Sequence, residues 1–283
     1  PGSPLGCMKD VCGKLGGIVS GDITDLATVE RIFNEYEVNT CFHLAAQALV
    51  GVANRSPLST FESNIKGTWN VLEAARNSKT FEGMVVASSD KAYGEHENLP
   101  YTEEFCLNAL HPYDASKACA DILARTYFNT YGLSVAVTRC ANIYGGGDLN
   151  FSRIIPDTIQ SILSDKPPII RSDGTPVRDY MYIADAVGAY LTLAEKLGKV
   201  KGEAFNFGTN SPIGVSELVD KIIKISGKTH LRPIIKGEAK GEINMQYLKS
   251  EKAANLLGWK PKYSLEEGLK ETIAWYDKYF ASM

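Results

Sequence analysis

Reactive side chains gather in the stretch VVASSDKAYGE, which covers residues 85–95. Its apolar start is typical of a buried strand, and four polar residues follow at once: Ser88, Ser89, Asp90 and Lys91. An adjacent carboxyl group and amine can act as acid and base on one ligand. The alternative interpretation of Asp90 and Lys91 is a solvated ion pair at the start of a loop.

A second set lies in the motif PYDASK, residues 112–117. Tyr113 and Lys117 are four residues apart, so in a helix they share one face and can meet one ligand. A tyrosine with a pKa of about 10 is a poor base, but a nearby ammonium and a cationic cofactor ring would lower that pKa. Such a tyrosine can remove a proton from a sugar hydroxyl while hydride leaves the same carbon. The competing interpretation is a solvated helix face.

The elements that must position these residues follow a regular alternation. Strand-like runs cover residues 16–22, 40–46, 84–89 and 134–145. Helical patterns lie between them: one begins after Asp25 as a cap, one follows Pro57, and one covers residues 113–131. This β-α alternation predicts parallel strands joined by right-handed crossovers. The predicted fold class is α/β, with a Rossmann-like doubly wound parallel sheet.

Beyond Gly147 the alternation becomes irregular, which predicts a smaller α/β lobe. We expect a first domain over residues 1–147 and a substrate lobe mainly over residues 148–283. The strand-like AFNFG and the helix that begins near Ser216 are expected to return to the first domain. Ligands of open α/β sheets bind outside the carboxyl ends of the strands.

Other strand ends are compatible with the same ligand site. The run at residues 16–22 ends at Asp22, where the carboxylate and Ile23 could meet an adenine ring, although Asp22 could equally form a turn. The next strand ends in Ala45 and Ala46, which allow a flat ligand to approach or a helix to pack closely. The last ends near Asn142. We expect these ends to line one edge.

Composition limits the partners. The 283 residues carry a net charge of −3 without runs of like charge, which favours a small-molecule ligand over nucleic acid or a membrane surface. No apolar run approaches the roughly 20 residues of a membrane span, and no signal sequence opens the chain. The first residue, Pro1, is not a start methionine, so we expect the chain to begin after processing or within a longer product. Six cysteines lack metal-ligand spacing and indicate free thiols in the cytoplasm: Cys7, Cys12, Cys41, Cys106, Cys119 and Cys140.

Taken in order, these motifs resemble those of the extended short-chain dehydrogenase/reductases, specifically the nucleotide-sugar epimerase/dehydratase branch. GDITD resembles the adenine-contacting segment, HLAAQ the strand beside the cofactor, and NIKGTWNVLEAA the helix with a characteristic asparagine. PYDASKACAD, TRCANIYG, SDGTPVRDYMYIADA and LLGWKP follow in the order of the family. The resemblance covers nearly the whole chain.

The resemblance implies NAD as the cofactor, a nucleotide sugar as the substrate, no metal and a homodimer. The implied cofactor-binding residues are Asp22, Ile23, Leu44, Ala45, Ala46, Gln47, Asn64, Ser88, Tyr113 and Lys117. The implied substrate-binding residues are Asn142, Arg153, Arg171 and Arg178. Among these, Arg178 would hold the nucleotide pyrophosphate with its planar guanidinium.

The SSDK motif distinguishes the activities within this resemblance. Epimerases generally carry small residues where this chain has Asp90 and Lys91, and Ser-Asp-Lys resembles CDP-glucose 4,6-dehydratases. The implied catalytic residues are Ser89, Asp90, Lys91, Tyr113 and Lys117. Tyr113 would deprotonate the C4 hydroxyl as hydride passes to NAD, Lys91 would take the C5 proton, and Asp90 would protonate the C6 hydroxyl. Hydride would then return to C6. A UDP-glucose 4-epimerase-like activity is the alternative.

One element of the resemblance is missing. The family begins with a strand and a G-x-x-G-x-x-G turn that holds the pyrophosphate of NAD. The glycines at Gly13, Gly16 and Gly17 precede a predicted strand instead of linking a strand to a helix. We therefore expect the first β-α unit to be missing and this chain to bind NAD weakly. A non-catalytic fragment that keeps the nucleotide-sugar lobe is the further alternative.

Overall fold

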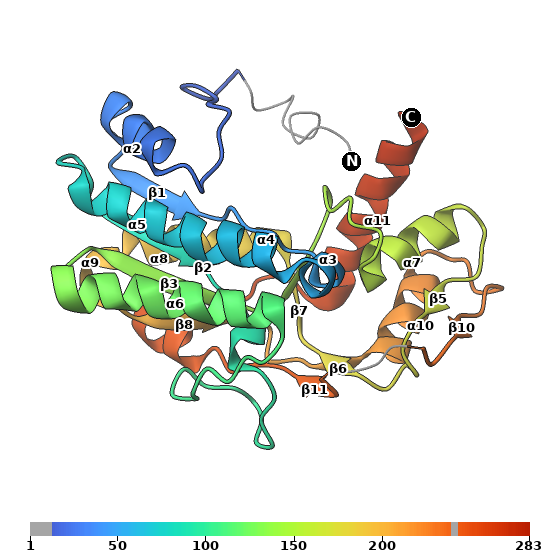
Figure 1. Ribbon diagram of the computed structural model, residues 1–283. Helices are drawn as coiled ribbons and strands as arrows, with labels where there is room; N and C mark the ends of the chain where they lie inside the picture. The colour runs from blue at the N-terminus through green and yellow to red at the C-terminus, as the bar shows by residue number, and fades with distance from the viewer. Residues whose placement is uncertain (1–12, 239–242) are drawn as a thin grey trace.

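Four parallel strands form the main sheet in the computed structural model of the protein, which describes residues 13–238 and 243–283 (Figure 1). They lie in the order β1 (Thr40–His43), β2 (Gly83–Ala87), β3 (Val135–Cys140) and β8 (Ala204–Phe207). Because every neighbouring pair is parallel, the carboxyl ends of the strands lie at one edge of the sheet. We call this edge the carboxyl edge.

The two central strands are buried because their sequences are almost continuously apolar. All six residues of β3 are buried, as are the first four of β2. Such runs suit strands covered by helices on both faces. The register places Ala87 opposite Thr138, and the next residue, Ser88, donates its backbone N–H to the Thr138 carbonyl at 2.9 Å. The sheet ladder therefore continues into the polar motif.

Helices cover one face of the main sheet (Figure 1). The helices on this side are α2 (Leu26–Glu35), α3 (Val50–Arg55), α4 (Pro57–Phe61), α5 (Gly67–Asn77) and α6 (Pro112–Tyr131), with the π-helical turn η2 (Glu62–Lys66) between α4 and α5. As predicted, the Asp25 side chain caps α2 by accepting the Ala27 N–H at 3.1 Å. Val135 and Val137 of β3 face this side and pack in the same buried cluster as Leu72 of α5.

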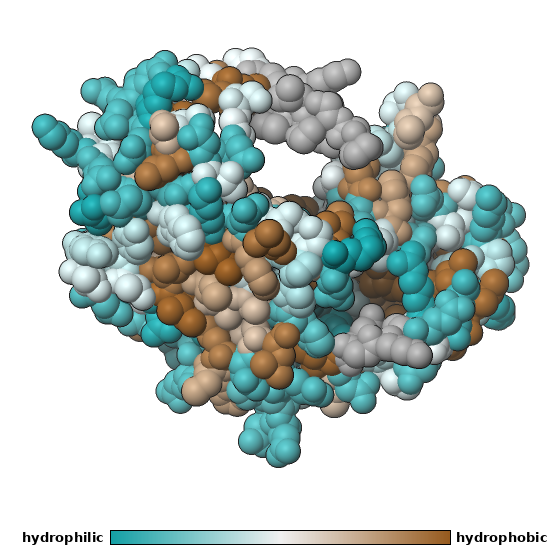
Figure 2. Space-filling model, in the orientation of Figure 1, coloured by the Kyte–Doolittle hydropathy of each residue, from teal (hydrophilic) through white to brown (hydrophobic). Residues whose placement is uncertain are grey.

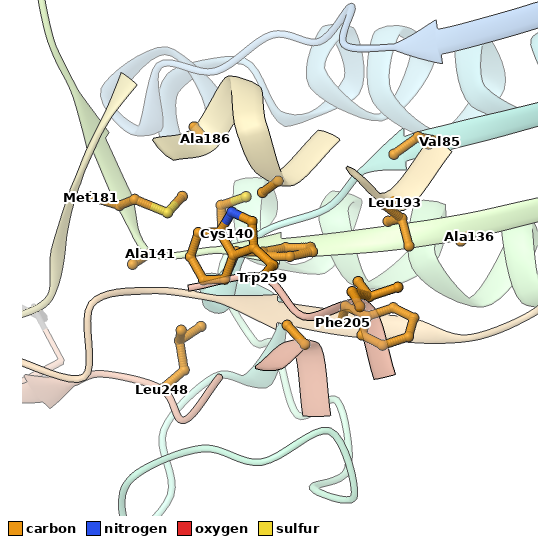
Figure 3. Close-up of a cluster of buried hydrophobic side chains, with 14 of the residues drawn as sticks. Val85, Ala136, Cys140, Ala141, Met181, Ala186, Leu193, Phe205, Leu248 and Trp259 are labelled. Carbon is orange, nitrogen blue, oxygen red and sulfur yellow. The ribbon is translucent and has the colours of Figure 1, made fainter. Parts of the chain in front are cut away.

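The opposite face is covered by α8 (Ile183–Glu195) and α9 (Leu197–Val200). Figure 3 shows the apolar cluster on this side, where Trp259 lies among side chains that include Cys140 and Phe205. The Trp259 indole donates to the Asp185 carbonyl at 3.3 Å, so its polar atom is satisfied while the ring packs. Because helices lie on both faces, the doubly wound Rossmann-like fold is confirmed.

A second group of elements, which we call the second lobe, lies on the right in Figure 1. Its helices are α7 (Ile154–Leu163), α10 (Val215–Ile225) and α11 (Leu265–Ala281), and its short strands are β5 (Ile169–Ile170), β6 (Val177–Arg178), β9 (Ile213–Gly214), β10 (Ile234–Ile235) and β11 (Met245–Gln246). Ile159, Ile162, Leu218 and Ile222 interlock α7 with α10 in one buried cluster. The turn at Asp173–Gly174 requires the glycine, whose φ is +86°.

The chain crosses between the two parts more than once. The predicted strand at residues 134–145 is broken at Ala141, and its second part, β4 (Asn142–Tyr144), pairs with β7 (Tyr180–Tyr182) instead of the main sheet. The π-helical turn η4 (Ala253–Leu257) packs beside β8. The predicted domain limits of 1–147 and 148–283 stay a prediction.

The strand predicted at residues 16–22 was wrong. Residues 16–22 have no strand structure, and α2 follows them directly. A strand needs a neighbour for its backbone N–H and C=O groups. Among the described residues, β1 pairs only with β2, so the other edge of β1 has no partner strand. Consistent with this open edge, Phe42 of β1 is 38% exposed.

Two further observations concern membrane and thiol chemistry. No helix in the described part of the chain is long and apolar enough to cross a bilayer. The cysteines described are free thiols: Cys41, Cys106, Cys119 and Cys140. The remaining two, Cys7 and Cys12, lie outside the described residues.

Candidate active site

The polar motif at the end of β2 forms a tight turn, η3 (Asp90–Tyr93), a single 3₁₀ turn. Ser89 precedes it with extended backbone, accepts the Lys91 N–H at 3.2 Å and donates its hydroxyl to the Asp90 carboxylate at 3.0 Å. Ser88 donates its hydroxyl to the Lys117 carbonyl at 3.2 Å. The two serines therefore fix the direction in which the chain leaves the sheet, and attach it to α6.

Asp90 is the most unusual residue of the turn. It is 1% exposed, and its Oδ2 atom is buried without a hydrogen-bond partner in the structure of residues 13–238 and 243–283. Burying an unpaired carboxylate oxygen costs about 1–3 kcal/mol or more. Such orphan groups call for an explanation, and a bound ligand is a common one. The oxygen is therefore available to a group that enters the site.

Tyr113 and Lys117 lie one helical turn apart on α6, as predicted. Lys117 is buried, and its Nζ donates to the Ala87 carbonyl at 2.7 Å. Burial lowers the pKa of Lys117 to about 8. The ammonium therefore holds the end of β2 against α6.

The pKa of Tyr113 is raised in the protein by itself, without the cationic cofactor ring that the prediction included. Burial, and after it the carboxylate of Asp90, raise the pKa of Tyr113 to about 12. Arg153 and a hydrogen bond with Ser89 act in the opposite direction but are weaker. The prediction included a cationic cofactor ring, whereas in the protein by itself desolvation penalises the charged phenolate. The result also places Asp90, Arg153 and Ser89 close to the phenol.

Asn64 connects the loop after β1 with α6. It lies in the π-helical turn η2 and is 2% exposed. Its Oδ1 accepts the Gln47 N–H at 2.7 Å, and its Nδ2 donates to the Gln47 carbonyl at 3.0 Å and to the Ser116 hydroxyl at 2.8 Å. Both the oxygen and the nitrogen of the amide are hydrogen-bonded, so Asn64 holds the predicted cofactor loop at Gln47 against Ser116 of α6. Ser116, its partner, had not been predicted.

The predicted adenine-side residues lie on the surface beside α5. Asp22 is exposed and accepts the Thr24 N–H at 2.8 Å, which lowers the pKa of its carboxyl. Asn70 of α5 donates to the Ile23 carbonyl at 3.0 Å, and the Ile23 side chain occupies the space where a Cβ on Gly67 would clash at 2.4 Å. The segment is thus fixed to α5 although it is not part of the sheet.

The loop after β1 presents open backbone at the carboxyl edge. Leu44 is 58% exposed and Ala45 is also exposed, while Ala46 and Gln47 are half-buried. A leucine so exposed beside an alanine suits a flat ligand that covers them.

The predicted substrate residues fall into two groups. Asn142 and Arg178 lie where β4 and β6 join the second lobe: Asn142 donates its side-chain amide to the Asp179 carbonyl at 3.4 Å, and Arg178 donates to the Asn244 carbonyl at 3.2 Å. Arg153 precedes α7, is 46% exposed and pairs with Asp148 at 2.8 Å.

Arg171 lies farther out. It follows β5 at the outer part of the second lobe (Figure 1), is 56% exposed and pairs weakly with Asp157 at 3.4 Å. Of the predicted arginines, Arg153 is the one whose charge reaches Tyr113, and Arg178 is the one held on a strand.

A buried polar network holds η3 against α6. Arg139 of β3 forms a bidentate ion pair with Asp121 of α6 at 2.7 and 2.9 Å, and the two side chains are 1% and 0% exposed. Arg139 also donates to the Tyr93 hydroxyl at 2.9 Å, which donates to Asn206 of β8 at 2.7 Å. This network was not predicted, because its members are distant from one another in the chain.

Two further residues of the site were missed. Asp114 follows Tyr113 and is buried; burial raises the pKa of its carboxyl, and Lys91 and His111 oppose that rise. Its position directly after Tyr113 in the sequence was the signal that could have identified it as a site residue. Gln246 of β11 is 1% exposed and accepts a hydrogen bond from Lys91 Nζ at 3.1 Å, with no signal in the sequence.

Proteins with a doubly wound sheet bind their ligands outside the carboxyl ends of the strands. In this protein, Asp90, Lys91 and Tyr113 lie at that edge. The model of the family described as GDP-mannose 4,6 dehydratase matches residues 13–272. The chain belongs to this family, which confirms the predicted epimerase/dehydratase resemblance and the predicted class of enzyme at the level of the family.

Characterised relatives include both dehydratases and epimerases. The dTDP-glucose 4,6-dehydratase of Shigella flexneri is 31% identical, covering 90% of this chain and 77% of the relative. The UDP-glucuronate 4-epimerase of Thermodesulfobacterium geofontis is 32% identical with the same coverage. The CDP-glucose 4,6-dehydratase of Salmonella typhimurium is 28% identical, covering 90% of this chain and 75% of the relative.

The similar solved structures also include both a dehydratase and an epimerase. A Bacillus anthracis dTDP-glucose 4,6-dehydratase in complex with NAD is 30% identical, with a TM-score of 0.85 over 97% of this chain and 84% of that chain. A Thermotoga maritima UDP-glucose 4-epimerase with UDP-glucose is 32% identical, with a TM-score of 0.88 over 93% of this chain and 84% of that chain.

Proposed function

We propose that the protein is an NAD-dependent nucleotide-sugar 4,6-dehydratase, whose Ser-Asp-Lys motif resembles that of CDP-glucose 4,6-dehydratases. The observation that carries the proposal is the turn at the end of β2, which presents a buried Asp90 with an unpaired oxygen, and Lys91 beside it, close to Tyr113. A dehydratase needs an acid and a base at C5 and C6 in addition to the base at C4. The net reaction removes one water from a nucleotide hexose and gives a 4-keto-6-deoxy sugar.

The described residues fit part of an NAD molecule. Asp22 and Ile23 would meet its adenine end, exposed Leu44 and Ala45 would lie along it, and Tyr113 would face its nicotinamide end. The sequence contains no G-x-x-G-x-x-G turn for the pyrophosphate. NAD, when bound, supplies a positive ring charge that favours the phenolate, and takes up and returns a hydride.

The first proton transfer belongs to Tyr113. The phenolate form of Tyr113 would take the proton of the sugar C4 hydroxyl; because burial raises its pKa, the protein alone keeps Tyr113 neutral near pH 7, and the phenolate would depend on the positive ring of bound NAD. Lys117 contributes indirectly, because its Nζ fixes the Ala87 carbonyl and with it the strand that leads to the turn. A tyrosine fixed in place and a rigid turn keep the reacting groups in register.

The elimination belongs to the turn. Once C4 is a ketone, the C5 proton is acidic, and Lys91 in its neutral amine form would remove it. Asp90 in its protonated form would donate a proton to the C6 hydroxyl, which leaves as water. The hydride would then return to C6 and C5 would take up a proton, which gives the 4-keto-6-deoxy sugar. Arg178 and Arg153 would bind the phosphates of the nucleotide from the second lobe, since guanidinium groups suit that role.

A 4-epimerase is the second candidate, because relatives at 32% identity carry that activity. Epimerisation requires only a ketone at C4 that turns over in the site. Asp90 and Lys91 would then have no role in the chemistry. Direct product analysis separates the two.

The role of Tyr113 is tested in the full-length gene product by Tyr113→Phe. We expect turnover to fall about 10²–10⁴-fold, because the variant loses its general base. The affinity for the nucleoside diphosphate, measured by calorimetry, should stay within about twofold. Tyr131→Phe is the matched control, since Tyr131 lies exposed at the far end of the same helix. Near-normal turnover of Tyr113→Phe would refute the assignment.

We further propose a homodimer through α5 and α6. Figure 2 shows apolar side chains gathered over these two helices, and Trp69 of α5 and Ile122 of α6 are 43% and 53% exposed. Exposed apolar patches of this kind mark protein contacts. Sedimentation should show a dimer. Trp69→Glu should dissociate it, whereas Leu191→Glu, at an exposed position of α8 on the other face of the sheet, should leave it intact. A wild-type monomer at micromolar concentration would contradict this assembly.

The cytoplasm is the proposed location. The free thiols of the described cysteines suit a reducing compartment.

A further inference from the structure

Gln246 contacts the η3 turn with both ends of its side-chain amide. Its Oε1 accepts a hydrogen bond from Lys91 Nζ at 3.1 Å, and its Nε2 lies 3.5 Å from the Asp90 carbonyl, a weak contact. The residue is 1% exposed and stands 155 positions after Lys91 in the sequence. A buried amide so far away in the chain therefore reaches the two residues proposed for the elimination.

The strand that carries Gln246 also holds the strand that carries Arg178. In the parallel β11–β6 pair, Gln246 lies directly opposite Arg178. The Asn244 carbonyl accepts the Val177 N–H at 2.8 Å and an Arg178 guanidinium N–H at 3.2 Å. One short segment thus contacts the elimination turn and the nucleotide-binding arginine.

The segment is fixed at its other end as well. Tyr101 donates its backbone N–H to the Tyr247 carbonyl at 3.0 Å and accepts the Lys249 N–H at 2.9 Å. The Tyr101 hydroxyl donates to the carbonyl of Gly94, which directly follows η3, at 2.6 Å. Contacts of Tyr101 therefore hold the segment around Gln246 beside η3, in addition to the side chain of Gln246 itself.

We propose that Gln246 is a positioning residue for the reaction: it holds the Lys91 amine at the site and joins η3 to the Arg178 strand. The inference rests on the proposed dehydratase function. A lysine side chain has four rotatable bonds, and fixing it costs conformational entropy. The hydrogen bond from Lys91 to the side-chain amide of Gln246 offsets this cost before substrate binds.

The test compares Gln246→Met, which keeps length and volume but loses the polar atoms, with Gln246→Glu, which keeps an acceptor oxygen. Misplacing a reacting group by about 1 Å can slow a reaction 100-fold. We expect Gln246→Met to lower kcat about 10–100-fold with KM within about threefold, and Gln246→Glu to retain at least about tenfold more activity. Gln160→Met on α7 is the control and should match wild type. A normal kcat for Gln246→Met, or equal losses in both Gln246 variants, would overturn the proposal.

A double variant separates positioning from general damage to the fold. If Gln246 acts through Lys91, then Lys91→Met with Gln246→Met should be no slower than Lys91→Met alone. Both single variants should also accumulate the 4-keto form of the substrate, two mass units lighter than the substrate, in single-turnover quenches. Independent, multiplying losses in the double variant would contradict the proposal.

A ligand-free measurement keeps this proposal distinct from the proposed function. Lysines labelled by reductive ¹³C-methylation give one NMR signal each, and Lys91→Met identifies the signal of Lys91. That signal should move toward the position and narrow width of flexible surface lysines in Gln246→Met. An unchanged signal would refute the contact even if the enzyme is a dehydratase. A C4-epimerised product would refute the dehydratase function even if the signal moves.

Discussion

His43, the last residue of β1, makes folding stability depend on pH in a calculable way. Its Nε2 lies 2.9 Å from the Thr68 hydroxyl, and it is 6% exposed. Burial, and after it the charge of Lys117, lower the pKa of His43 from 6.5 to about 4. Below pH 6.5 the unfolded chain therefore binds a proton that the folded protein refuses until about pH 4.

Stability contributed by this neutral histidine is present above pH 6.5 and is lost as the pH falls toward 4. For the two pKa values above, the loss between pH 7.5 and pH 5.5 is about 1.3 kcal/mol, or roughly tenfold in the unfolding equilibrium constant. Carboxyl groups contribute to the same pH range, so the effect of His43 must be isolated by comparison with a variant.

The assay is urea unfolding of wild type and His43→Gln at both pH values. Glutamine keeps a polar side chain for Thr68 but does not titrate. The difference in unfolding free energy between the two pH values should be about 1.3 kcal/mol larger in wild type than in His43→Gln. Equal differences would show that His43 titrates normally in the folded protein, and the reasoning from its burial would be refuted.

Other predictions follow from the buried charges. Asp121→Asn should lower the free energy of unfolding by about 3–5 kcal/mol, because it leaves the Arg139 guanidinium buried without its ion-pair partner. Glu35→Gln, which removes an exposed ion pair, should change the free energy of unfolding by less than about 1 kcal/mol. Urea unfolding of both variants measures the two changes. Asp90→Asn should lower the pKa of Tyr113 from about 12, since the carboxylate is a cause of the raised value. Ultraviolet titration of tyrosinate, with Tyr113→Phe subtracted, measures it, and an unchanged pKa would contradict the proximity of the two groups.

Local patterns were sufficient for much of the fold. The helical pattern over residues 113–131 predicted α6 within one residue, and Asp25 was recognised as the cap of α2. The continuous apolar runs predicted β2 and β3 because strands buried on both faces need no polar positions. These features depend on neighbours within a few residues, which the sequence shows directly.

Features that depend on distant partners could not be predicted. Residues 16–22 have the composition of a strand but lack a neighbouring strand within the described residues, so no ladder forms. Lys117 was placed beside the phenol of Tyr113, but its Nζ donates to Ala87. The contact of Gln246 with Lys91 joins residues from opposite halves of the chain. Desolvation, which controls the pKa of Tyr113, exists only after folding.

The predicted site residues as a set stay a prediction, and product analysis in deuterated water tests their central role most directly. The full-length gene product, NAD and a nucleotide hexose are incubated in D₂O, and the product is examined by mass spectrometry and NMR. The proposal predicts a 4-keto-6-deoxy sugar that has lost one water and carries deuterium at C5, with both effects strongly reduced in Asp90→Asn. A product of unchanged mass, inverted at C4 and free of deuterium, would contradict the dehydratase and identify a 4-epimerase.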